Sequence, residues 1–170
     1  MPLKTGDVPT FFVDAMLGNI ARKLRLLGYD SQYFSDIIDE KLIDSAKKEK
    51  RIIISKDKEL IKKTQKLGMR SIHITKEEEV EEFLEIINSV NLKRIQINGN
   101  ISRCSKCNSL TELVDKDIIK EKIPQGVLKS NNTFWICKCC NQVYWEGTHI
   151  KNLQEFVDKI NERLQQSIRR

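Results

Sequence analysis

Three aspartates of this chain stand where a short apolar run gives way to an amphipathic segment. Asp14 follows the run TFFV, Asp39 follows SDII, and Asp57 follows RIIISK. If the apolar runs are parallel strands, the three carboxylates lie along one edge of a sheet, where open α/β folds bind their ligands. Carboxylates gathered in this way repel one another unless a cation lies among them, and Mg²⁺ or Mn²⁺ suits oxygen ligands. The pattern therefore indicates a metal site for chemistry on phosphates, as in a metal-dependent nuclease.

Each aspartate also has a structural interpretation. An aspartate in front of a helix commonly accepts hydrogen bonds from free backbone N–H groups, so each of the three, taken alone, is explained by helix capping. Because three successive junctions carry the same acid, the metal-binding interpretation is kept for the set. Four other acids are alternative or weaker candidates for ligands, namely Asp36 and Glu40 beside Asp39, and, farther away, Asp30 and Asp44.

Three basic residues stand close to the aspartates along the chain. Arg22 and Arg25 fall on one polar face of the helix expected after Asp14. Lys56 directly precedes Asp57. A guanidinium binds a phosphate through paired hydrogen bonds, so these side chains could hold a substrate phosphate. A solvated surface explains them equally well, and the sequence leaves both interpretations open.

Four of the five cysteines form two C-x-x-C pairs, Cys104 with Cys107 and Cys137 with Cys140. Four thiolates in two such pairs match a tetrahedral structural Zn²⁺ site. The stretch between the pairs has the length found in zinc ribbons, where β-hairpins fill it. A redox-active C-x-x-C motif is disfavoured, because two pairs occur and no βαβ pattern surrounds them. Cys139 lies inside the second pair and is interpreted as a bystander.

The segment YWEGTH follows the second cysteine pair and contains two aromatic residues and a histidine. We expect Trp145 to pack in the small core of the ribbon. His149 could contact a phosphate or the other domain, although a structural hydrogen-bonding role is the better supported interpretation.

Residues 10–91 alternate between short apolar runs and amphipathic segments, which predicts an α/β fold. Strands are expected over residues 10–13, 31–34, 51–55 and 71–75, with helices over about 17–27, 40–49, 58–67 and 75–90. Strands separated by single helices and short turns are typical of a small doubly wound parallel sheet. A capping box of Thr75 and Glu78 predicts the start of the last of these helices.

The rest of the chain is less regular until its last segment. Residues 91–101 are either a strand or a linker, and the pattern does not decide between them. Residues 151–170 predict an amphipathic helix, with one apolar face formed by Leu153, Phe156, Val157, Ile160 and Leu164.

The 170-residue chain is 39% hydrophobic and 32% charged, with a net charge of +6. The positive charge favours polyanionic partners such as RNA or DNA, although a lysine-rich solvated surface explains it as well. No stretch approaches the ~18 apolar residues of a membrane span, and the amino terminus lacks the apolar core of a signal peptide. We therefore expect a cytoplasmic protein without a membrane partner, whose cysteines bind metal rather than form disulfides.

Three runs taken together resemble the Mut-seven C-terminal RNase family: FFVDAMLGNIARKLRLLGYD, DEKLIDSAKKEKRIIISKDKEL, and CSKC followed by CKCCNQVYWEGTH. The similarity extends from about Phe11 to His149. It implies a PIN-like nuclease domain over residues 1–95, a zinc ribbon over 101–150 and a terminal helix over 151–170. It also implies that Asp14, Asp39 and Asp57 hold Mg²⁺ or Mn²⁺.

The chain departs from the family pattern at a few positions. The third motif reads Ser55-Lys56-Asp57 where Thr-Arg-Asp is usual, and Lys23 stands where an aromatic residue is common. PIN-type sites usually carry four acids, and Asp36 is our candidate for the fourth. None of these departures removes a carboxylate.

The leading hypothesis is a metal-dependent ribonuclease that prefers single strands and hydrolyses RNA phosphodiester bonds, with ribosomal RNA and tRNA among the candidate substrates. In this hypothesis the zinc ribbon and the basic surface help to hold RNA. The alternative is a non-catalytic RNA-binding or ribonucleoprotein module, in which the acids are only helix caps. A phosphoaspartate receiver or phosphatase is less well supported, because Ala15-Met16 follows Asp14 and no second acid stands two residues on.

Overall fold

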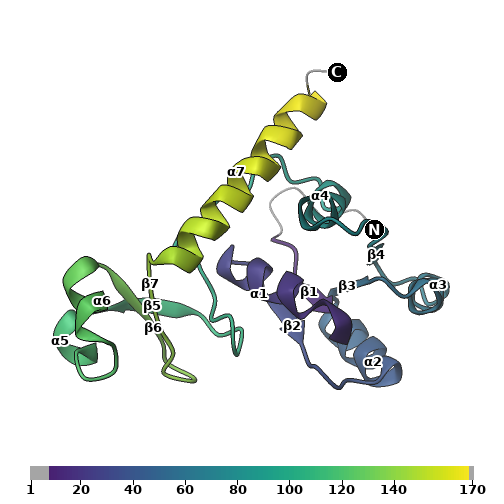
Figure 1. Ribbon diagram of the computed structural model, residues 1–170. Coiled ribbons are helices and arrows are strands. Elements are labelled where there is room, and N and C mark those ends of the chain that lie inside the picture. Colours follow the sequence, from purple (N-terminus) through teal and green to yellow (C-terminus); the bar gives the residue numbers. More distant parts are fainter. Residues whose placement is uncertain (1–7, 169–170) are drawn as a thin grey trace.

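The computed structural model describes residues 8–168, so the predicted nuclease domain and terminal helix each extend beyond the described residues. Four short strands form one parallel sheet in the order β2-β1-β3-β4 (Figure 1). They are β1 (Phe11–Val13), β2 (Ser31–Tyr33), β3 (Ile52–Ser55) and β4 (Ser71–His73). The four predicted strands and their parallel arrangement are confirmed.

Helices cover both faces of this sheet, as expected for a doubly wound fold. They are a 3₁₀ turn η1 (Ala15–Leu17), α1 (Gly18–Leu26), α2 (Asp39–Glu49), α3 (Lys58–Lys66) and α4 (Glu79–Ser89). Helices α1 and α4 pack on one face, and α2 and α3 pack on the other. Each loop between a strand and the next helix is short, so the helix starts stay close to the carboxyl edge of the sheet.

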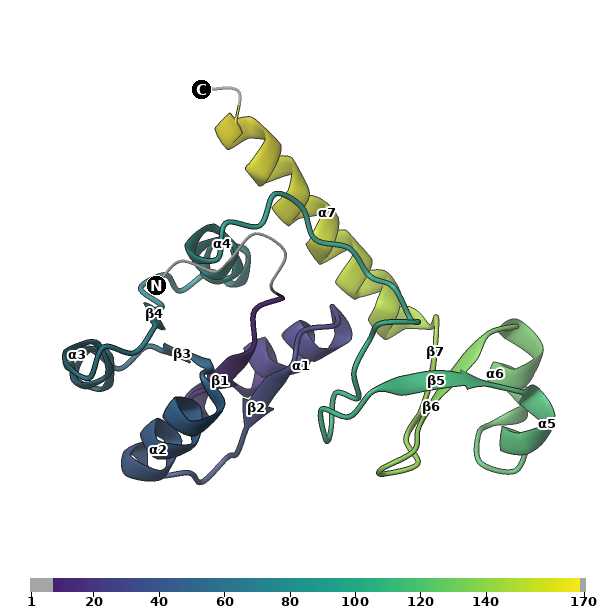
Figure 2. The same cartoon turned by 180° about the vertical axis from the view of Figure 1, so that it is seen from behind.

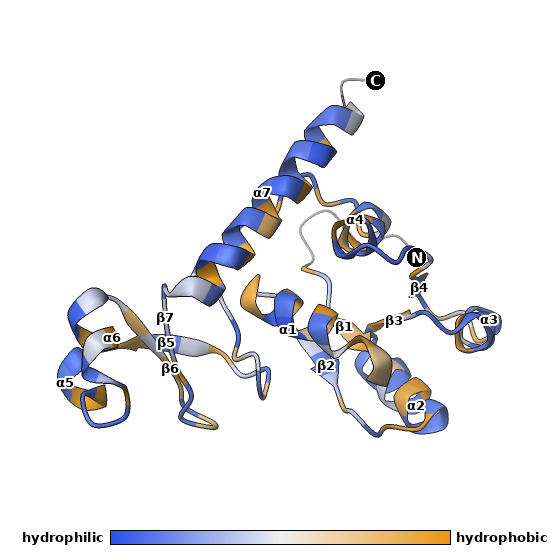
Figure 3. Ribbon diagram, viewed as in Figure 1, coloured by the Kyte–Doolittle hydropathy of each residue, from blue (hydrophilic) through white to orange (hydrophobic). Residues whose placement is uncertain are grey.

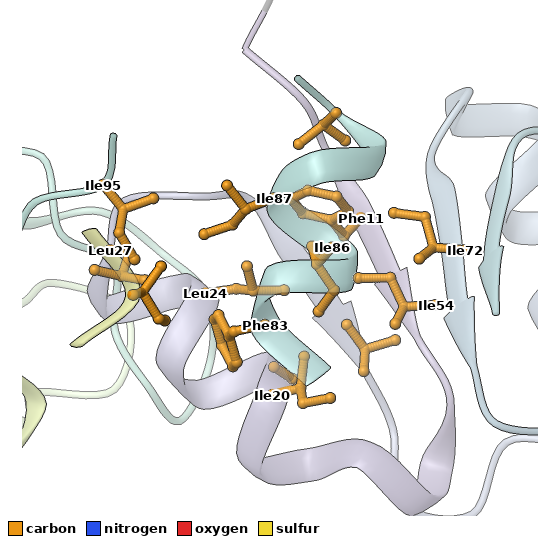
Figure 4. Close-up of a cluster of buried hydrophobic side chains, with 14 of the residues drawn as sticks. Phe11, Ile20, Leu24, Leu27, Ile54, Ile72, Phe83, Ile86, Ile87 and Ile95 are labelled. Atoms are coloured by element: carbon orange, nitrogen blue, oxygen red, sulfur yellow. The ribbon is translucent and has the colours of Figure 1, made fainter. Parts of the chain in front are cut away.

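Side chains that alternate along the central strands fill two cores. Phe11 and Ile54 point to the face covered by α1 and α4, where they meet Leu24 and Phe83 (Figure 4). Phe12 and Ile53 lie in the core formed with α2 and α3. A parallel strand buried on both faces needs a continuous apolar run, which explains the strong signal of FFV and III in the sequence.

The predicted start of α4 is wrong. The helix begins at Glu79, and Glu78, its N-cap residue, makes no capping hydrogen bond with its side chain. Thr75 instead donates hydrogen bonds from its backbone N–H and its hydroxyl to the carboxylate of Glu85. Because Thr75 is hydrogen-bonded to Glu85 in the second turn of the helix, residues 75–78 stay irregular and no capping box forms.

A second, antiparallel sheet follows, in the order β5-β6-β7. Its strands are β5 (Thr111–Val114), β6 (Phe134–Cys137) and β7 (Val143–Trp145), with two short helices, α5 (Lys116–Ile119) and α6 (Gln125–Ser130), between β5 and β6. Ile119, Phe134 and Val143 form its small core. The stretch between the cysteine pairs therefore holds helices as well as strands.

The last described helix, α7 (Thr148–Ile168), starts three residues earlier than predicted and connects the two parts of the molecule. The five residues of its predicted apolar face are all buried. Phe156 packs against Phe83 of α4, with ring centroids 5.0 Å apart. In Figure 3, the visible ribbon of α7 is largely hydrophilic, whereas β1 and β3 are apolar.

Residues 91–101 form a linker without a strand and run alongside α7 (Figure 2). The side chain of Asn161 holds this linker, because its amide oxygen accepts from the N–H of Ile95 at 3.0 Å and its nitrogen donates to the carbonyl of Ile95 at 2.9 Å. No helix within residues 8–168 combines the length and the apolar composition that crossing a membrane requires.

Candidate active site and metal centre

Asp14 and Asp57 lie at the switch point of the parallel sheet. The chain leaves β1 toward β2 on one side and later enters β3 on the other, so β1 and β3 are the neighbours between which the winding direction reverses. Asp14 follows β1 directly, and Asp57 stands two residues after β3. In open α/β sheets this crevice at the carboxyl ends of the strands is where ligands bind.

A serine connects these two positions. The hydroxyl of Ser55, a fully buried residue, donates to Oδ2 of Asp14 at 2.5 Å and accepts from the backbone N–H of Asp57 at 2.9 Å. The hydrogen bond orients the Asp14 carboxylate and ties the turn after β3 to the end of β1. The sequence offered this hydroxyl only as part of a motif, and its role as a bridge required the structure.

Capping explains only one of the three aspartates. Asp57 is the N-cap of α3, and its Oδ1 accepts from the N–H groups of Glu59 at 2.7 Å and Leu60 at 3.3 Å. Asp14 makes no capping hydrogen bond. Asp39 is the first residue of α2, behind the N-cap Ile38. The carboxylates of Asp14 and Asp39 are therefore left for another purpose.

The charges of the neighbouring acids act on Asp39. Burial raises the pKa of Asp39, and the negative charges of Asp14, Asp57 and Glu40 raise it further, while Lys63 opposes them. Asp39 is thus near enough to Asp14 and Asp57 to sense their charges. The three acids are not a compact ligand set, because within residues 8–168 only the four cysteines have donor atoms that all lie within 4.8 Å of one another. A cation among the three acids would relieve this repulsion.

The other candidate acids take different positions. Asp36 is exposed in the loop between β2 and α2, where it lines a separate surface depression with Phe34 and Ile38. Glu40 pairs with Lys63 at 3.3 Å. Asp30 precedes β2 and so lies at the opposite, amino-terminal edge of the sheet. There it binds Arg51 at 2.6 Å, which removes it from the candidate site.

The three basic residues that were predicted to bind phosphate differ in their exposure and in their ion pairs. Arg22 is exposed and lines a groove that starts at Ala15, the residue after Asp14, and we call it the acid-edge groove. The groove is also lined by Lys56, Glu79 and Glu82, whereas Asp14, Asp39 and Asp57 do not line it. Lys56 is already paired with Glu82 at 2.6 Å and Glu77 at 3.5 Å.

The structure contradicts the prediction that Arg25 binds a substrate phosphate. Only 4% of Arg25 is exposed. Its guanidinium donates to the carbonyl oxygens of Ser31 at 2.8 Å and Ser105 at 2.9 Å. Arg25 therefore holds the first cysteine loop against the edge of the parallel sheet. Its partner Ser105 is remote in sequence, which is why the helical pattern alone suggested an exposed position.

The four paired cysteines form a compact cluster. The sulfur atoms of Cys104 and Cys140 lie 3.4 Å apart, as do those of Cys107 and Cys137. Zn–S bonds of about 2.3 Å place the sulfurs of a tetrahedral site about 3.8 Å apart. The cluster can therefore hold zinc with little adjustment. Cys139 is exposed and lies outside the group.

Each cysteine loop ends in an asparagine with a left-handed backbone. Asn108 has φ of 68° and Asn141 has φ of 60°. Asparagine tolerates this conformation better than most residues, which explains why each follows a C-x-x-C pair. Asn108 also reaches the parallel sheet, where its oxygen accepts from Ser31 N–H at 3.0 Å and its nitrogen donates to Asp30 at 2.8 Å.

These features define a class: a small doubly wound α/β domain with acids at its switch point, joined to a four-cysteine ribbon. The family model described as the Mut7-C RNAse domain matches residues 9–157, and the chain belongs to this family. The searches of curated proteins and of solved structures returned no match. The family description indicates a ribonuclease-like function.

Proposed function

We propose that the protein is a metal-dependent ribonuclease whose active site is formed by Asp14, Asp39 and Asp57. The observation that carries the proposal is that Asp14 and Asp57 lie at the switch point with Asp39 near them. Asp14 and Asp39 are not used as caps, and burial together with the neighbouring charges raises the pKa of Asp39. Acids that only cap helices have no need to be placed where they repel one another.

The donor atoms fit a hard divalent cation at this site. Carboxylate oxygens suit Mg²⁺ or Mn²⁺, whereas the thiols of the ribbon suit zinc, so the two kinds of metal are separated by ligand chemistry. When bound, the cation would supply Lewis acidity, activating a water and neutralising charge on the phosphodiester.

The residues around the acids position the carboxylates and the substrate. Ser55 fixes one oxygen of Asp14 by donating its hydroxyl proton. Arg22, exposed in the acid-edge groove, binds the phosphate of the substrate. Lys56 stays paired with Glu82, so we assign it to the charge balance of the groove rather than to a direct phosphate contact.

RNA is the proposed substrate, with ribosomal RNA and tRNA as candidates, and the net charge of +6 favours its binding. The ribbon takes part by extending the basic surface beyond the acids. The zinc has a structural role in this proposal. The cysteine cluster offers four protein ligands and leaves no open position for a substrate in a tetrahedral site.

The direct test replaces one acid. Asp14→Asn keeps the size of the side chain and removes its charge, so Mn²⁺-dependent cleavage of a labelled single-stranded RNA should fall by about a hundredfold or more. Asp44→Asn is the matched control, because Asp44 is an exposed acid on α2 outside the cluster, and it should cleave at the parental rate.

Circular dichroism should show that both variants fold. Equal cleavage by Asp14→Asn and the parent would exclude the proposed site. RNA binding that weakens with salt, without cleavage by any variant or by the parent, would favour the non-catalytic RNA-binding module instead.

A further inference from the structure

A second groove lies between α1 and the junction of β7 with α7, and we call it the junction groove. Arg22 and Leu26 line it from α1, and Tyr144, Trp145 and His149 line it from the ribbon side. Among the described residues that line it, none is acidic. The groove therefore combines a permanent cation and a histidine with aromatic and aliphatic surface, a combination suited to an anionic ligand with a flat ring.

The junction groove continues from the acid-edge groove. Arg22 lines both, because it stands on the exposed face of α1 between Asp14 and the ribbon. A ligand strand that passes from the acids along α1 thus meets Arg22 first and the β7–α7 junction next. The two grooves belong to different parts of the chain, which only the folded arrangement brings together.

The aromatic wall of the junction groove is held in place. The Tyr144 hydroxyl accepts from Ser105 N–H at 3.0 Å and lies 3.1 Å from the sulfur of Cys104. Trp145 packs against the ribbon core, as expected from the sequence, and remains partly exposed. Its indole also lies over Gly147, where a Cβ would come within 2.7 Å of its Nε1. A rigid aromatic surface beside a cation binds unpaired bases by stacking and loses little conformational entropy.

We infer that the junction groove binds an unpaired nucleotide of the same RNA strand whose cleaved phosphodiester lies at the acids. This inference rests on the proposed ribonuclease function. Arg22 contacts the phosphate between the two grooves, and Trp145 and His149 contact the base beyond it. A base in a duplex is stacked and paired on both sides, so a subsite of this kind selects single-stranded RNA.

The test measures RNA binding without cleavage. The full chain with its zinc carries Asp14→Asn, no other divalent metal is added, and a fluorescent single-stranded RNA is titrated by anisotropy. His149→Ala in this background should weaken binding about 5- to 10-fold, from the loss of roughly 1 kcal/mol of base contact. Lys151→Ala is the control, because Lys151 is an exposed cation two residues away that does not line either groove.

A second measurement locates the base. RNA containing 4-thiouridine should cross-link under ultraviolet light to the peptide that holds Trp145 and His149, and double-stranded RNA should compete poorly. Equal weakening by His149→Ala and Lys151→Ala, or cross-links confined to other peptides, would overturn the inference while leaving cleavage by the parent chain untouched. A parent chain that binds RNA through His149 but never cleaves it would support the nucleotide-binding role of the junction groove and exclude the proposed ribonuclease function.

Discussion

Asp39 is ionised in surroundings that disfavour its charge, because burial and the neighbouring acids raise its pKa in the folded state. Such a shift costs no stability below the pKa of an unfolded aspartate, and the cost grows as the pH rises from that value through the raised pKa of the folded state. Without added divalent cations, Asp39→Asn should therefore raise the melting temperature at pH 7 by about 1–2 °C, a modest effect because the side chain is exposed.

Two further measurements check this explanation of Asp39. The parent and Asp39→Asn should melt alike near pH 3, where about nine in ten unperturbed aspartates are protonated. Adding Mn²⁺ at pH 7 should stabilise the parent and leave the variant unchanged. A variant that melts below the parent at pH 7 would show that Asp39 stabilises the fold by itself.

Asn108 and Asn141 offer a matched pair at the ends of the two cysteine loops. Replacing either by alanine costs about 1 kcal/mol for the left-handed backbone. Asn108→Ala also leaves the N–H of Ser31 without its partner and removes one hydrogen bond from Asp30, which keeps Arg51, so its total cost should be about 2–4 kcal/mol. Urea unfolding of the zinc-loaded chain should separate the two variants; equal losses would mean that the contact of Asn108 with the sheet contributes nothing.

Single residues were predicted from the sequence to different extents. The cysteine ligands follow from local spacing, and the acids follow from their place after apolar runs. The burial of Arg25 does not, because its partner Ser105 is eighty positions away. The repeated asparagine after each C-x-x-C pair was a local signal that could have indicated the left-handed ends of both loops.

At the scale of the elements, the side chain of Asn161 makes the hydrogen bonds between the linker and α7, in addition to the apolar packing of Ile95. Asn161→Ala removes both hydrogen bonds to Ile95 and should cost about 1–3 kcal/mol. The amide of Ile95 should then exchange with deuterium about tenfold faster or more. Asn152→Ala is the control, since Asn152 is exposed on the same helix. Unchanged exchange at Ile95 would show that apolar packing alone holds the linker.

The elements themselves were largely predictable, since apolar runs and helical spacing report directly on burial. The start of α4 was not, because Glu85 competes for the residue that the capping box required. The linker was not predictable for a similar reason. The backbone N–H and carbonyl of Ile95 pair with the side chain of Asn161, a partner that leaves no periodic pattern in the linker sequence.

Over the whole molecule, the zinc ribbon supports one edge of the parallel sheet. Chelating the zinc should therefore increase deuterium exchange in β5–β7 and also at Ser31, whose N–H donates to Asn108. Ile53 in β3 should stay protected, since its N–H donates to Arg70 inside the sheet. Loss of protection confined to the ribbon would show that the two parts are independent.

Helix α7 completes the core around β1, although the whole ribbon lies between them in the sequence. A ribosome adding about 5–20 residues per second delivers the three aspartates several seconds before the helix that finishes their scaffold. Until α7 emerges, Phe83 lacks its partner Phe156. A nascent chain therefore carries the three aspartates early and completes the core around β1 late, after its own cysteine segment has been translated.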